Sequence, residues 1–112
     1  MQASNWFQLG ANCEAVFLLL NTNLELRYTL QPNAFLIRSS CTIRAADLKD
    51  KIQSGNWTSE EAHTWCEELK MLMVWYRALK AIEKSGEDVK SSDMNFNPLA
   101  KFNREIDFDQ KD

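Results

Sequence analysis

The sequence holds few of the residues on which nucleotide-binding and catalytic motifs depend. Glycine occurs only at positions 10, 55 and 86, and histidine occurs only as His63. Glycines this far apart do not form the glycine-rich loop that cradles a phosphate, which excludes a P-loop or a Rossmann turn. With a single histidine, the chain also has few side chains suited to acid–base catalysis or metal binding. We therefore expect a protein that is not an enzyme and that binds no cofactor.

The chain also lacks an excess of basic residues and a long apolar run. Its 13 Lys and Arg are outnumbered by 16 Asp and Glu, and a net charge of −3 does not attract a phosphate backbone, so we expect no nucleic-acid partner. The longest apolar run, residues 15–20, is far shorter than the roughly 20 residues of a transmembrane helix. No basic residue precedes Arg27, so neither a signal peptide nor a transit peptide is indicated. We expect a cytoplasmic protein of a bacterial or host cell, or one carried in a virion, without membrane contact.

The three cysteines do not form a metal-binding motif. Cys13, Cys41 and Cys66 are odd in number and widely spaced, which favours reduced thiols over a disulfide framework. His63 and Cys66 form an H-x-x-C step, one half of a zinc site, but no C-x-x-C pair completes it. His63 also lies four residues before Glu67, a spacing that can orient a general base on a helix. A metal enzyme or hydrolase built on His63 is kept as a third functional hypothesis, and we expect no catalytic residue and no metal ligand.

Two segments in the first half of the chain show a β-strand pattern. Residues 24–30 alternate leucine or tyrosine with polar residues, which indicates one buried and one solvent-facing side. Turn formers follow at residues 31–33, and residues 34–43 continue with β-formers, so the pattern predicts an antiparallel hairpin. The apolar run at residues 15–20 does not distinguish a strand from a buried helix segment. As a strand, it would extend the hairpin to a three-stranded meander over about residues 15–43.

The second half shows helical patterns with clear ends. Residues 45–54 carry apolar side chains four apart and end at Gly55, a favoured helix stop. Thr58 opens a capping box with a glutamate three residues later, and Gly86 provides the next stop. We therefore predict a short helix over residues 45–54 and a long helix over residues 59–85.

Strands followed by helices favour an α+β fold, in which the hairpin or meander packs on the two helices. We predict a single domain over residues 1–86 and a C-terminal arm over residues 87–112. Within the arm, Asn97 and Pro98 are typical of a helix start, and they predict a short amphipathic segment over residues 97–106.

The predicted long helix has more apolar surface than one sheet can cover. One stripe runs along most of its length and consists of Ala62, Trp65, Cys66, Leu69, Leu72, Met73, Tyr76 and Leu79. A second stripe covers its C-terminal half and consists of Met71, Val74, Trp75, Ala78 and Ile82. The second side must meet the short helix, the C-terminal arm or a second chain, and the sequence leaves these alternatives open. The arm sets apolar anchors among charged residues, as do segments that fold into another protein's groove. The candidate partner-binding residues are Met71, Val74, Trp75, Ala78, Ile82, Phe96, Leu99, Phe102, Ile106 and Phe108.

Because the sequence gives no support for catalysis, nucleotide binding, nucleic-acid binding or membrane insertion, we expect the protein to function by contact with other proteins. We predict a non-enzymatic interaction subunit of a larger assembly, such as a phage or virus particle or one of its assembly components. It would form homo- or hetero-oligomers by burying the aromatic and methionine side chains of the candidate residues. The alternative is a small acidic intracellular inhibitor or regulator that docks on a host protein or nucleoprotein complex. Its net negative charge would let it compete with nucleic acid for a basic groove.

Overall fold

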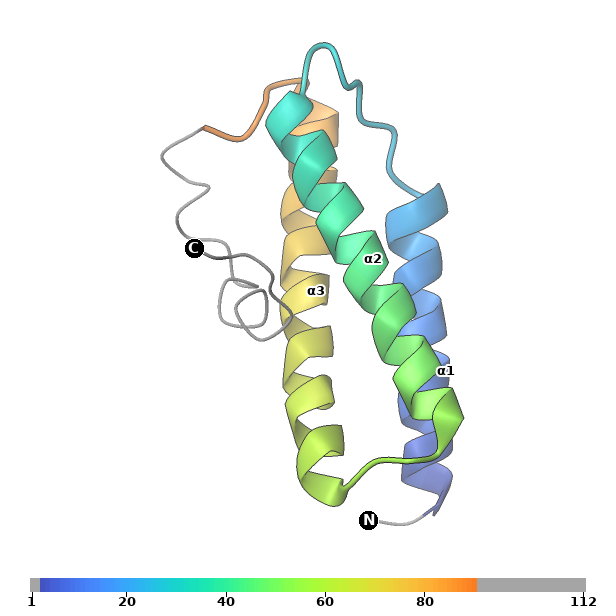
Figure 1. Cartoon of the computed structure of the whole chain (residues 1–112). Coiled ribbons are helices and arrows are strands. Elements are labelled where there is room, and N and C mark those ends of the chain that lie inside the picture. Colours follow the sequence, from blue (N-terminus) through green and yellow to red (C-terminus); the bar gives the residue numbers. More distant parts are fainter. Residues whose placement is uncertain (1–2, 91–112) are drawn as a thin grey trace.

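The computed structural model describes residues 3–90 of the chain, and the side chains of residues 8–90. This part consists of three α-helices: α1 (Ala3–Thr22), α2 (Pro32–Ser54) and α3 (Ser59–Ser85). The helices run alongside one another, and each reverses the direction of the one before it (Figure 1). The α1–α2 connection and the end of α3 lie at one end of the bundle, and the α2–α3 connection lies at the other.

The described residues contain no β-strand, so the predicted α+β fold with a hairpin or meander over residues 15–43 is wrong. Residues 15–20 belong to α1 and residues 34–43 belong to α2, while residues 24–30 are a connection. In that connection, the first two apolar residues of the alternating pattern, Leu24 and Leu26, are buried against the helices. The next two, Tyr28 and Leu30, are exposed, so the alternation does not mark one buried side of a strand.

The predicted short helix over residues 45–54 is only the second half of α2. The buried residues of α2 continue a helical spacing from its first turn to its last, and Pro32 stands at the helix start, where proline is favoured, rather than in a hairpin turn. These buried residues are Ala34, Ile37, Cys41, Arg44, Ala45, Leu48 and Ile52. The helix ends at Gly55, whose φ of 72° is in the left-handed region.

The predicted long helix over residues 59–85 is α3, and its predicted ends are confirmed. The Thr58 hydroxyl accepts a hydrogen bond from the Glu61 amide, and the Glu61 carboxylate accepts one from the Thr58 amide. Gly86 ends the helix with a φ of 78°. Both ends are therefore set by local chemistry that satisfies free backbone groups.

One apolar core joins the three helices. Its fully buried members include leucines from each helix, namely Leu20, Leu48, Leu72 and Leu79. Trp75, on the second apolar stripe of α3, is only 7% exposed, and Met71, Ala78 and Ile82 pack against the same core. Two neighbouring helices, α1 and α2, thus cover more of α3 than a single sheet on one side would cover.

The end of the chain's described part closes one end of the bundle. The Asp88 carboxylate accepts hydrogen bonds from the amides of Asn33 (3.0 Å) and Ala34 (2.8 Å), so it caps the start of α2 across the bundle. The buried Gln31 side chain donates to the carbonyl oxygens of Ile82 and Glu87. The predicted arm therefore begins with residues that pack on the helices, and its remainder, residues 91–112, lies outside the described residues.

Candidate functional site

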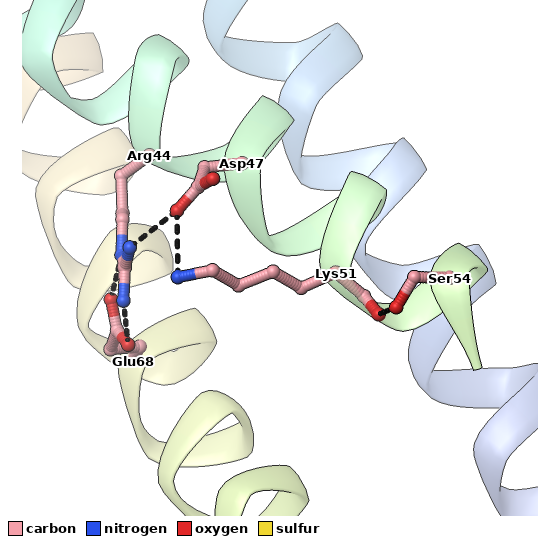
Figure 2. Close-up of polar contacts among 5 residues, drawn as sticks. All are labelled: Arg44, Asp47, Lys51, Ser54 and Glu68. Carbon is pink, nitrogen blue, oxygen red and sulfur yellow. Dashed lines mark hydrogen bonds and ion pairs between the residues drawn. The ribbon is translucent and has the colours of Figure 1, made fainter. Parts of the chain in front are cut away.

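The bundle has two main hollows, and the first is a polar cleft of about 810 Å³ beside α2 and the first turns of α3. At its inner side lies the ion pair between Arg44 and Glu68, which Figure 2 shows bridging the two helices. Glu68 is fully buried, and Arg44 is 6% exposed. The Arg44 guanidinium donates to both carboxylate oxygens of Glu68.

A second carboxylate joins this cluster from α2. Asp47 Oδ2 lies 2.6 Å from Arg44 Nη1 and 3.1 Å from Lys51 Nζ (Figure 2). The bidentate contact and the second acceptor match the fork of donors on a guanidinium. These charges therefore satisfy one another, and they fix how α2 sits against α3.

The rest of the polar cleft is lined mainly by acidic and short polar side chains. These other lining residues are Ser54, Asn56, Thr58, Glu60, Glu61, Thr64 and Trp65. Thr58 and Glu61 form the capping box of α3. The polar contacts described in this cleft therefore join α2 to α3 and cap the start of α3.

The second hollow is an apolar groove of about 580 Å³ between α1 and α3. The α1 side supplies Leu9, Asn12, Ala15, Val16 and Leu19, and the α3 side supplies Cys66, Leu69, Lys70, Met73, Val74 and Arg77. No residue of α2 lines it, so α2 does not cover this side of the α1–α3 pair. Val74 is 50% exposed there.

Two of the α3 residues that line the groove, Lys70 and Arg77, carry a positive charge. Both are exposed, and they lie two turns apart along α3. Lys70 Nζ lies 3.2 Å from Glu67, but both side chains are largely in solvent, where such a pair is weak. Among the described residues no acidic group pairs with Arg77. The groove is thus apolar along its length and positively charged on its α3 side.

The predicted partner-binding residues separate into three groups in the structure. Val74 lies in the apolar groove, half exposed. Met71, Trp75, Ala78 and Ile82 are buried or packed against the core, so the bundle itself accounts for their apolar contacts. The predicted tail residues fall outside the described residues, namely Phe96, Leu99, Phe102, Ile106 and Phe108.

The α1 side of the groove could not be recognised from the sequence pattern alone. Residues 15–20 are apolar on every side, so their pattern does not show which of them face the core and which face a groove. A helical spacing linking Leu9, Val16 and Leu19 was the available signal, and it appears only when residues 3–22 are treated as one helix.

His63 and the three cysteines do not come together in one site among the described residues. Burial raises the pKa of Cys13 to about 11, with smaller contributions from Cys66 and Glu68, and burial raises the pKa of Cys41 to about 12. His63 is exposed on α3. Within residues 3–90, no three His, Cys, Asp or Glu side chains gather closely enough to hold a metal ion. In the same residues, no helix has the length and hydropathy needed to cross a membrane.

No protein-family model, curated protein or solved structure matches this chain.

Proposed function

We propose that this protein is a non-enzymatic interaction subunit of a larger assembly, and that its apolar groove docks an amphipathic helix of a partner chain, acidic on its polar side. The observation that carries the proposal is the open side of the α1–α3 pair. An apolar groove between two packed helices is the usual receptor for an amphipathic helix, whose apolar stripe enters the groove.

The architecture favours a helix as the occupant. With α2 on one side of the α1–α3 pair, a helix on the other side would complete a four-helix arrangement with ordinary helix packing. From Cys66 to Arg77, the α3 side of the groove extends for about 16 Å. This length suits about three turns of a docked helix.

The charge of the groove favours an acidic occupant. Lys70 and Arg77 would meet carboxylates on the polar side of the partner helix, which speeds association and disfavours a basic partner. The same cations argue against the alternative in which this surface competes with nucleic acid for a basic groove. An inhibitor of that kind would need an acidic docking surface elsewhere on the chain.

The test uses a designed probe, a fluorescein-labelled helical peptide of about 14 residues. It has leucine and phenylalanine at helical spacing on one side and glutamate on the other. We expect micromolar binding by fluorescence anisotropy, and weaker binding of a peptide with lysine in place of glutamate or with its order scrambled. The full-length chain is used throughout.

A pair of matched variants locates the binding. Val74→Asp places a carboxylate in the groove beside Lys70 and Arg77, and we expect it to weaken binding of the glutamate peptide at least tenfold. Ile43→Asp is the control, because Ile43 is 71% exposed on α2 and does not line the groove. Equal binding by both variants, or equal binding of the scrambled peptide, would contradict the proposal.

A further inference from the structure

We propose that a second copy of this chain packs along the exposed side of α3, with the two α3 helices antiparallel. The inference goes beyond the proposed function, because it concerns the outward side of α3 rather than the space between α1 and α3, and it names the occupant as the same protein. The two surfaces share Lys70, Val74 and Arg77. The test below therefore includes charges that lie outside the groove.

The contact surface is a stripe on the side of α3 that faces away from the core. Its members recur at alternating steps of three and four residues, the spacing that keeps side chains on one side of a helix. Every member is exposed. The stripe consists of Glu60, His63, Glu67, Lys70, Val74, Arg77, Ala81 and Lys84. It spans about 36 Å, which is most of the length of the helix.

The order of charges along the stripe makes it complementary to itself. Glu60 and Lys84 each lie 12 residues from Leu72 in the sequence. Glu67 and Arg77 each lie five residues from it. When a second α3 runs antiparallel with its Leu72 level with that of the first, each of these glutamates lies opposite a basic residue of the other copy. The two-fold axis repeats each contact, so the dimer gains four contacts between opposite charges.

These charges are largely unused within the described bundle. Among residues 3–90, no ion pair involves Glu60, Arg77 or Lys84. In the same range, the ion pair of Glu67 is with Lys70, and both side chains are largely in solvent. A second copy can therefore pair with these groups without breaking a buried contact.

The helix dipole does not account for the whole order of charges. It favours acidic residues in the first turn of a helix and basic residues in the last, and its influence falls off within that turn. Glu60 and Lys84 lie in those turns. Glu67 and Arg77 lie in the interior of α3, about two turns from its ends. Pairing with a second copy explains the placement of these two residues as well.

The centre of the pairing is apolar. Val74 is 50% exposed and lies two residues from Leu72, where the two-fold axis passes. It would face the aliphatic stem of Lys70 of the other copy, since these two positions are also equidistant from Leu72. Met71 and Met73 flank the axis and are partly buried against the core. Each copy would thus bury Val74, while the charged contacts set direction and register.

Charge reversal on the stripe tests this pairing in the full-length chain. A basic variant, Glu60→Lys with Glu67→Lys, places like charges opposite one another in all four contacts, and so does an acidic variant, Arg77→Glu with Lys84→Glu. By sedimentation equilibrium, we expect wild type to dimerise at micromolar concentrations and each variant to dimerise at least tenfold more weakly. Mixing the two variants restores opposite charges in every contact, so the mixture should dimerise about as tightly as wild type.

Asp50→Lys with Glu87→Lys is the matched control. Both residues are exposed and lie outside α3, and the double substitution changes the net charge as much as the basic variant does. We expect it to dimerise like wild type. Circular dichroism checks that the helices of every variant are intact.

Introduced cysteines test the direction of the helices. In a Cys66→Ser background, chains with His63→Cys are mixed with chains with Ala81→Cys under mild oxidation. His63 and Ala81 lie equally far from Leu72, so the antiparallel register places them opposite one another, and we expect a disulfide between the two kinds of chain. Two copies of position 63 lie about 27 Å apart in this register, so the His63→Cys chain alone should not cross-link.

Several results overturn the inference: a wild type that stays monomeric, a mixture of charge variants no more dimeric than either alone, a control that dimerises as weakly as the charge variants, or cross-links of position 63 to itself. The groove is tested separately, because the basic variant changes no residue that lines it. Binding of the glutamate peptide to that variant, together with a monomeric wild type, would leave the proposed function standing and remove only this inference. A wild type that dimerises but does not bind the peptide would do the reverse.

Discussion

Replacing Arg44 by methionine tests the ion pair that joins α2 to α3. Methionine keeps much of the volume of the arginine stem but removes the donors to both carboxylate oxygens of Glu68. Glu68 is fully buried, so the variant leaves a carboxylate without its partner and without water. Breaking a buried pair in this way costs about 3–5 kcal/mol of unfolding free energy. The total free energy of unfolding of a small domain is about 5–15 kcal/mol, so this loss is a large part of it.

The partner substitution should cost less. In Glu68→Leu, the Arg44 guanidinium still contacts Asp47 at 2.6 Å, and Asp47 reaches solvent. We expect a loss of about 1–3 kcal/mol, the range for an incompletely satisfied buried group. The double variant Arg44→Met with Glu68→Leu should recover most of the stability lost in Arg44→Met, because no buried charge is left unpaired.

Urea unfolding followed by circular dichroism measures these differences. With a slope of about 1–2 kcal/mol per molar urea, a loss of about 3–5 kcal/mol in Arg44→Met should lower the midpoint by about 1.5–5 M. Lys70→Met is the control, because it breaks an exposed pair on α3 and should change stability by less than about 1 kcal/mol. An Arg44→Met loss no greater than that of Lys70→Met, or a double variant no more stable than Arg44→Met, would refute the reasoning.

Three further substitutions test the ends of the helices by the same unfolding assay. Thr58→Ala removes the capping box of α3 and should cost about 0.5–2 kcal/mol; no measurable loss would contradict this role. Gly86→Ala should cost about 1 kcal/mol because its φ of 78° is unfavourable for a side chain, and an unchanged midpoint would argue against that conformation. Burial acts to raise the pKa of Asp88, but hydrogen bonds from the backbone of Ala34, Asn33 and Val89 outweigh it and lower that pKa. The stability it provides is therefore present above the unfolded pKa of about 3.9 and is lost as the pH falls through the folded value. Asp88→Asn should thus be less stable than wild type at pH 7, and the difference should shrink below about pH 4; a difference independent of pH would contradict the assignment.

The parts of the fold that the sequence predicted correctly are those set by neighbouring residues. The ends of α3 follow from Thr58, Glu61 and Gly86, which lie within one turn of the groups they satisfy. The end of α2 at Gly55 follows for the same reason. Local capping chemistry therefore located the boundaries of α3 and the end of α2.

The start of α2 was missed because it depends on distant residues. Gln31 provides no side-chain cap for this helix, and the carboxylate that caps it comes from Asp88, far along the chain. Without that contact in view, the β-formers after Pro32 favoured a strand. Tertiary packing outweighed this local preference, as it commonly does for β-propensity.

The candidate site was only partly accessible to the same reasoning. The sequence pattern singled out Val74, which lies in the apolar groove. It singled out Trp75 as well, on the premise that one layer covers α3, whereas the structure buries Trp75 within the bundle. The α1 side of the groove required the knowledge that residues 3–22 are a helix beside α3, which follows from the fold rather than from any motif.

The most direct test of the docking surface is to map the glutamate peptide on the full-length chain by NMR. Methyl and amide signals of the chain are followed as the peptide is added. We predict shift changes concentrated at Val16, Met73 and Val74, with the signals of Ile43 unchanged. Shifts centred on Ile43 and its neighbours on α2, or no saturable shifts at any site, would contradict the account.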